Sequence, residues 1–239
     1  MVKKLITFGC SWTYGVGVNY HDQMTEQDYK ETAWNKNICD EFSFRGLLSK
    51  KYNLENINFS TGGSPNQKQF MEAEQFLPKY NDKDTVVLWG LTSVYRYYMY
   101  DSKKKCYESL FLGNQNSFNK IMLSRVFDYD NEIARLEQKM LFFNDYFDKK
   151  GIRNFWYNTF NKHEYKNKFD NVLFNGEDLL SIMINDFDDN SAYHKSDWCD
   201  TDKKILQAKK MGLVNPITLH PTKQAHKIIS EHFEKEITL

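Results

Sequence analysis

Short apolar runs and amphipathic stretches alternate along the first half of the chain, and this alternation restricts the fold more than any other feature. Buried strands are expected over 5–8, 56–59 and 84–91. Between them, helices are expected over 42–51 and from Asn66 onward. A strand–helix–strand–helix–strand order with short connections predicts a parallel sheet with helices on both of its faces.

The second half of the chain continues the same pattern. Apolar residues spaced for one helix face run over 133–147, and Lys149-Lys150-Gly151 then supplies the cations and the glycine that are typical of a helix end. Another buried strand follows over 152–159, and a last helix begins near Thr222. We therefore predict a single domain over 1–239, an α/β three-layer sandwich with a flavodoxin-like, mainly parallel sheet of about five strands.

Two stretches do not fit the alternation. Residues 97–128 are polar and aromatic without a clear period, and residues 161–202 are rich in Asp, Asn and Lys. Both follow strands, where the loops of an α/β fold reach over the binding site. Loops of this length are often lids or binding elements, so we expect both insertions to determine specificity.

The composition excludes several classes of function. The 32 Lys and Arg residues balance the 32 Asp and Glu residues, so no overall charge favours nucleic acid or an acidic membrane as a partner. No apolar run has transmembrane length, and 5–8 is too short for a signal-peptide core, so we expect a cytoplasmic protein. Cys10, Cys39, Cys106 and Cys199 form no CxxC pair, which disfavours a zinc cluster, and we expect no metal or organic cofactor.

A serine and a histidine are placed where a hydrolytic site needs them. Ser11 lies in a turn between Gly9 and Gly15, directly after the first strand, at the sheet edge where α/β proteins bind ligands. A serine hydrolase also needs a base and donors for the oxyanion. His220 precedes Pro221, which places it just outside the last helix. The structural alternatives are a turn serine and a helix-cap or surface histidine.

Two further segments can supply oxyanion donors. Gly63, in a cluster of turn residues after the second strand, can bring its N–H close to a substrate because it has no Cβ. Thr92 and Ser93 follow the third strand and offer small hydroxyl groups at the same sheet edge.

These segments together resemble the SGNH (GDSL-type) hydrolases in their order and spacing, over almost the whole chain. The four blocks that carry the resemblance are Gly9-Cys10-Ser11-Trp12-Thr13-Tyr14-Gly15, Asn58-Phe59-Ser60-Thr61-Gly62-Gly63, Gly90-Leu91-Thr92-Ser93 and Ile217-Thr218-Leu219-His220-Pro221.

The resemblance implies Ser11 as nucleophile and His220 as general base. It also implies oxyanion donation from the backbone N–H groups of Ser11 and Gly63 and from the side chain of Thr92. The sequence departs from the family pattern at Cys10, where the family has Asp, and at Thr92, where it has Asn. The loss of one oxyanion donor costs on the order of a hundredfold in rate.

A third departure concerns the acid that orients the histidine. The family places it where this chain has Ile217. Asp197, Asp200 or Asp202 could substitute from another loop, or a backbone carbonyl could hold the imidazole and leave a Ser-His dyad.

The expected function is a serine esterase that hydrolyses a small acyl ester through an acyl-enzyme. The resemblance favours an acetyl group, and a carbohydrate is one possible carrier of it. Arg96 and Asn66 are candidates for substrate binding, and Arg96 could engage an anionic group. The alternatives are a catalytically inactive SGNH-like domain that binds a glycan or a protein, and a sugar O-acyltransferase. The sequence leaves the substrate and the oligomeric state open.

Overall fold

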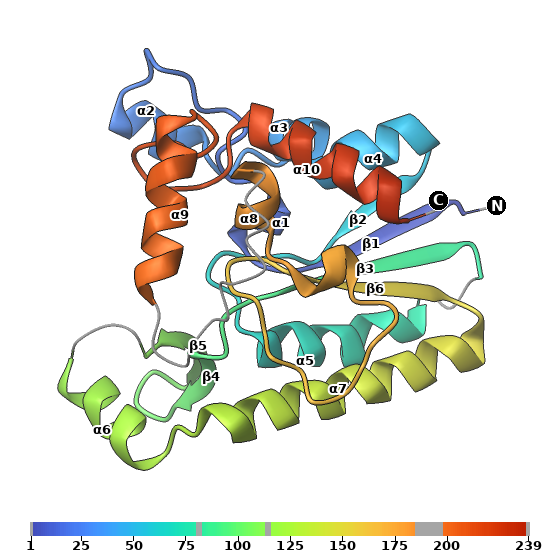
Figure 1. Ribbon diagram of the computed structural model, residues 1–239, viewed down its shortest axis with the longest axis vertical. Coiled ribbons are helices and arrows are strands. Elements are labelled where there is room, and N and C mark those ends of the chain that lie inside the picture. Colours follow the sequence, from blue (N-terminus) through green and yellow to red (C-terminus); the bar gives the residue numbers. More distant parts are fainter. Residues whose placement is uncertain (1, 80–82, 113–115, 185–197, 238–239) are drawn as a thin grey trace.

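A parallel sheet lies between two layers of helices in the computed structural model, which describes residues 2–79, 83–112, 116–184 and 198–237 (Figure 1). The four strands of this sheet are β1 (Lys4–Phe8), β2 (Glu55–Asn58), β3 (Thr85–Leu91) and β6 (Arg153–Asn158). Their order is β2-β1-β3-β6, and every neighbouring pair is parallel. The α/β class and the mainly parallel sheet predicted from the sequence are confirmed.

One face of the sheet packs against helices α5 (Asn66–Phe76) and α7 (Tyr129–Lys150). Side chains alternate along a strand between its two faces, so Ile6 and Phe8 point to this side, together with Trp89 of the neighbouring strand. The rings of Phe8 and Trp89 stack with their centroids 4.5 Å apart. This core is therefore largely aromatic.

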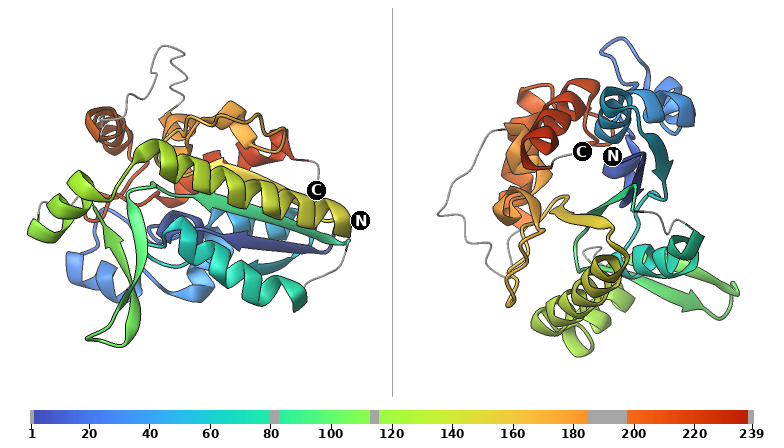
Figure 2. Two further views of the ribbon diagram at one scale, coloured as in Figure 1. Left: turned by 90° about the horizontal axis from the view of Figure 1, so that it is seen from below. Right: turned by 90° about the vertical axis from the view of Figure 1, so that its right-hand side faces the viewer.

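The opposite face packs against helices α4 (Phe44–Tyr52), α8 (Leu179–Ile184) and α10 (Lys223–Glu236). Leu5 and Leu88 point to this side, in register with the alternation on the first face. Figure 2 shows the sheet edge-on between the two layers. The carboxyl ends of β1 and β3 lie at one edge, where the predicted site residues follow.

The sheet has four strands among the described residues, where about five were expected. Beyond β6 the chain makes only isolated parallel bridges, Trp156 with Val172 and Asn158 with Asp178. Between these bridges Phe174 and Asn175 have positive φ angles of 60° and 54°. Such left-handed backbone cannot continue a strand, so the fifth position holds a 3-10 turn, η2 (Leu173–Gly176), instead.

The helix expected over 42–51 is divided at Ser43. Helix α3 (Lys36–Phe42) ends before it, and the Ser43 hydroxyl accepts a hydrogen bond from the N–H of Gly46 (3.3 Å) to cap α4. Helix α2 (Glu26–Thr32) was not predicted. The predicted end of α7 is correct, since Gly151 closes that helix with φ 66°.

The first insertion has more regular structure than was expected. Strands β4 (Arg96–Asp101) and β5 (Cys106–Phe111) form an antiparallel hairpin, followed by α6 (Ser117–Arg125). The rings of Tyr98 and Tyr107 stack across the hairpin with centroids 5.0 Å apart. Aromatic pairs across two strands explain why this stretch lacks the period of a helix.

The second insertion includes η2 and α8 and runs into α9 (Trp198–Lys210). Within the described ranges, no helix combines the length and apolar character that a membrane span requires. The division of the chain into domains stays a prediction.

Candidate active site

Ser11 is the first residue of a short helix, α1 (Ser11–Tyr14), that directly follows β1. Gly15 ends this helix with φ 100°, a conformation that a side chain would strain. The buried Arg45 holds the last turn, because its guanidinium donates to the carbonyl oxygens of Thr13 (3.2 Å) and Tyr14 (2.9 Å). The short helix that carries the serine is therefore fixed at its last turn by hydrogen bonds from Arg45.

His220 lies at the start of the last helix but outside it, as the sequence predicted. Thr222 is the N-cap of α10, and Pro221 separates it from the histidine. The carbonyl oxygen of His220 accepts a hydrogen bond from the N–H of Asn215 (2.9 Å). Leu219, the preceding residue, has φ 60°, which is rare for a bulky side chain and is the kind of strain often found at functional sites.

A network of neutral groups holds the imidazole where the family has a carboxylate. The Nδ1 atom of His220 lies 2.8 Å from the hydroxyl oxygen of Thr218. The hydroxyl of Tyr29 lies 2.9 Å from the same oxygen, and Thr218 donates its own proton to Oδ1 of Asn215 (3.1 Å). Asn215 donates from Nδ2 to the Tyr29 hydroxyl (3.2 Å), which closes the ring of bonds.

The protons of this network bear on the tautomer of the histidine. The oxygen of the Asn215 amide is identified by the backbone N–H groups of Ile217 (3.2 Å) and Thr218 (2.8 Å), which donate to it. When the Thr218 hydroxyl also donates to this oxygen, it accepts from His220, and Nδ1 carries the proton. In that tautomer the lone pair lies on Nε2, the atom that a general base needs.

His220 is neutral over most of the pH range. Burial, together with the positive charge of Arg96, lowers its pKa to about 4, and a hydrogen bond with the backbone of Thr218 acts in the opposite direction. A neutral imidazole can accept a proton from a serine at ordinary pH.

Ser11 and His220 line the same cavity, which has a volume of about 230 Å³. The two residues come from opposite ends of the chain, and the fold brings them together. Phe111 of the first insertion and Asn161 of the second also line it. The remaining lining residues are Trp12, Ser93, Arg96, Phe160, Ile205, Thr218 and Leu219.

Thr92 and Asn66 bind each other, and neither lines the 230 Å³ cavity; Asn66 instead lines a separate cavity of about 490 Å³. The side-chain amide of Asn66 accepts from the N–H of Thr92 (2.8 Å) and donates to its carbonyl oxygen (2.8 Å). The hydroxyl of Thr92 donates to the carbonyl oxygen of Ser64 (3.0 Å). As an oxyanion donor, Thr92 would have to break this bond. Its neighbour Ser93 lines the cavity, and the hydroxyl oxygen of Ser93 accepts a hydrogen bond from the N–H of Tyr95 (3.3 Å).

Gly63 lies in the turn after β2, with φ 63° and an exposed backbone. The N–H of Thr61 in the same turn donates to the carbonyl oxygen of Gly9 (3.1 Å), so the turn lies beside the segment that leads to Ser11. Gly63 is not among the residues that line the 230 Å³ cavity, and its role as a donor stays a prediction.

The candidate acids either lie outside the described residues or are exposed to solvent. Asp197 and the side chain of Asp200 lie outside the described residues, and Asp202 is exposed on α9. Cys10, where the family has Asp, is buried; burial raises the pKa of its thiol, against the opposing charge of Arg96, and keeps it neutral. Within the described ranges, no cluster of His, Cys, Asp and Glu side chains could hold a metal ion.

No protein-family model matches the sequence, and no curated protein matches it either. Solved structures do resemble the chain along its length. One is a protein assigned to the lipolytic G-D-S-L family from Desulfitobacterium hafniense, with 11% identity, a TM-score of 0.45 and 98% of both chains covered. Another is a psychrotrophic esterase from Pseudoalteromonas, with 11% identity, a TM-score of 0.45, and coverage of 98% of this chain and 96% of that one.

A carbohydrate esterase, described as having divergent catalytic and non-catalytic binding functions, has 13% identity and a TM-score of 0.46, with 99% of this chain and 70% of that one covered. Each of these alignments covers 98% or 99% of this chain.

Proposed function

We propose that the chain is a serine esterase of the SGNH type that hydrolyses a small acyl ester, with acetyl as the preferred acyl group. The observation that carries this proposal is the cavity that Ser11 and His220 share. The bond from His220 Nδ1 to Thr218 leaves Nε2 of that histidine available as a base. A nucleophile and an oriented base in one cavity are the minimum for acyl transfer.

In the proposed reaction, Nε2 of His220 takes the proton of Ser11 as the serine oxygen attacks the ester carbonyl. The oxyanion that forms is stabilised by the backbone N–H of Ser11 and by the Ser93 hydroxyl, which replaces Thr92 in this role. The protonated histidine returns its proton to the leaving alcohol, and water then hydrolyses the acyl-enzyme by the same steps.

Thr218 takes the place of the acid in this proposal. It accepts the Nδ1 proton and fixes the ring, but it adds no negative charge to stabilise the imidazolium. We therefore expect slower acylation than a Ser-His-Asp triad would give.

Hydrolysis of 4-nitrophenyl acetate and of a panel of acetylated sugars tests the proposal. Ser11→Ala and His220→Ala should each abolish activity. Matched controls are Ser124→Ala and His21→Ala, which change the same residue types at exposed positions and should leave activity intact. If all five proteins, wild type included, are equally inert or equally active, the esterase proposal is wrong.

One observation favours the non-catalytic alternative, a binding domain for a glycan or a protein. The partner of His220 Nδ1 within the described residues is a hydroxyl and not a carboxylate. Binding of an acetylated sugar without any hydrolysis by the wild type would support this alternative. Transfer of the acyl group to an added sugar, in preference to water, would instead indicate an O-acyltransferase.

A further inference from the structure

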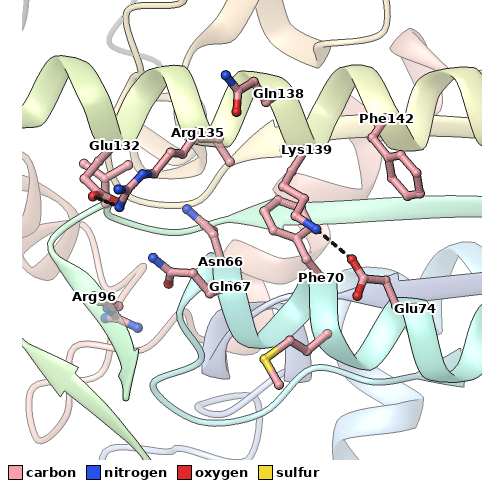
Figure 3. A pocket seen from close by; sticks show the side chains of 13 residues that line it. Asn66, Gln67, Phe70, Glu74, Arg96, Glu132, Arg135, Gln138, Lys139 and Phe142 are labelled. Atoms are coloured by element: carbon pink, nitrogen blue, oxygen red, sulfur yellow. Dashed lines mark hydrogen bonds and ion pairs between the residues drawn. The ribbon is translucent and has the colours of Figure 1, made fainter. Parts of the chain in front are cut away.

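Arg96 lies at the junction of two cavities. It lines the 230 Å³ cavity that holds Ser11 and His220, and it also lines a larger cavity of about 490 Å³ between α5 and α7. Figure 3 shows the larger cavity, with the two helices on either side and Arg96 on the neighbouring strand β4 at one end. Arg96 therefore belongs to the walls of both cavities.

The guanidinium of Arg96 has a donor that is not used within the described part of the chain. Its Nη1 atom is buried and has no hydrogen-bond partner there. The guanidinium carbon lies 5.0 Å from the ring centre of Phe160 and 5.9 Å from that of Phe111. These rings hold the cation in place but cannot accept a hydrogen bond in the guanidinium plane.

Among the charged side chains that line the two cavities, both carboxylates pair with other cations, which leaves Arg96 as an additional positive charge. In the larger cavity, Glu74 pairs with Lys139 (2.7 Å) and Glu132 pairs with Arg135 (2.9 Å). The catalytic cavity has no carboxylate among the described residues that line it. An anionic ligand group would thus meet a positive charge that no side chain of the cavity walls neutralises. Arg is well suited to bind a carboxylate through two parallel hydrogen bonds.

The rest of the larger cavity suits a ligand with hydroxyl groups. The Oε1 atom of Gln67 is buried without a hydrogen-bond partner in the described structure, so it is an acceptor for a ligand O–H. Phe70 and Phe142 supply rings against which the C–H face of a sugar can pack. A volume of about 490 Å³ is ample for a small-molecule site.

We propose that the substrate is an acyl ester of an acidic saccharide, with Arg96 binding its carboxylate and the α5–α7 cavity holding the sugar. This proposal rests on the proposed esterase function and adds the substrate class to it. Arg96 favours an anionic group in the ligand, and Gln67 favours a hydroxyl donor. A uronic acid carries both groups in one molecule. Bound in this way, the ester group lies beside Arg96 in the cavity of Ser11.

The test compares an O-acetylated galacturonate with its carboxyl-methylated, neutral counterpart and with an O-acetylated sulfated galactose. The wild type should hydrolyse the carboxylate ester with a kcat/KM at least about 10-fold above the neutral one, as expected for a hydrogen bond to a charged group. Arg96→Gln should reduce this ratio to about one, and Arg96→Lys should retain part of it. Arg125→Gln, which removes an exposed arginine on α6, is the matched control and should keep the full ratio.

Equal rates on charged and neutral esters, or a preference that survives in Arg96→Gln, would overturn the proposal. A preference for the sulfated ester would overturn its assignment to a carboxylate. Calorimetry separates this proposal from the esterase function, because it needs no turnover. Galacturonate should bind at least about 10-fold more tightly than galactose, and Arg96→Gln should abolish the difference. If no ester is hydrolysed but this difference is found, only the esterase function fails; equal binding of both sugars overturns the saccharide proposal.

Discussion

Replacement of Thr218 by valine tests how the histidine is held without an acid. Valine has nearly the shape of threonine but cannot accept the Nδ1 proton of His220, 2.8 Å away. The bond strengthens when the imidazole becomes charged in the transition state, and a hydrogen bond to a charged group contributes about 1.5–3 kcal/mol. We therefore expect kcat/KM to fall by roughly 10- to 150-fold.

The assay is the pH dependence of ester hydrolysis by a graded set of variants. Wild-type activity should persist at pH 5.5, because the pKa of His220 is lowered to about 4 by burial and by Arg96. Thr218→Val should reduce the plateau and leave the position of the acid limb unchanged, because the hydrogen bond that raises this pKa involves the backbone of Thr218, which the substitution keeps. Thr218→Ser restores the hydroxyl and should restore most of the rate.

Tyr29 provides a milder perturbation of the same network. Tyr29→Phe removes one donor to Thr218 and should reduce the rate less than Thr218→Val does. The matched control is Tyr20→Phe. The ring of Tyr20 packs edge-on against that of Tyr29, with centroids 6.0 Å apart, and no hydrogen bond to Thr218 is found for it among the described residues. Activity of Thr218→Val within twofold of the wild type would refute this role of the Thr218 hydroxyl.

Three other predictions concern the support of the site and its titrating groups. Arg45→Met should lower the free energy of unfolding by about 3–5 kcal/mol in urea titrations, because it leaves Asp40, 2.7 Å from the guanidinium, without this partner. Burial lowers the pKa of His226 to about 3 from 6.5, so the unfolded chain takes up a proton below pH 6.5 that the folded chain does not. Stability should therefore fall with decreasing pH by about 1.4 kcal/mol per unit for this residue, and His226→Asn should make the slope of unfolding free energy against pH shallower. In the folded protein a thiol reagent should modify the exposed Cys106 and not the buried Cys10, as peptide mass mapping can show; equal labelling of both would contradict the placement of Cys10.

Much of the sheet could be predicted because its signals are local. Continuous apolar runs such as Thr85–Leu91 mark strands that are buried on both faces. The start of α5 after Pro65 and the end of α7 at Gly151 follow from residues with strong backbone preferences. The hairpin of β4 and β5 could not be predicted in the same way, because its stability depends on cross-strand aromatic contacts that leave no helical or strict alternating period.

The same distinction between local signals and long-range contacts applies to the candidate site. The positions of Ser11 after the first strand and of His220 before the last helix were predictable, because a turn serine and a histidine before proline have local sequence signals. The bond between Tyr29 and Thr218 was not, because Tyr29 lies in a helix that was not predicted and meets Thr218 only in the folded chain. The bonds of Thr92 to Asn66 and Ser64 are likewise long-range, so the sequence did not indicate that the Thr92 hydroxyl is already bonded while its neighbour Ser93 lines the cavity.

The central claim is that His220 activates Ser11 as a nucleophile, and reaction with a fluorophosphonate tests it most directly. Peptide mass mapping should find a single adduct on Ser11 in the wild type and none in Ser11→Ala. The labelling rate of His220→Ala should fall by at least about 100-fold, the scale of general-base catalysis. No adduct on Ser11, or labelling at the same rate without His220, would contradict the account.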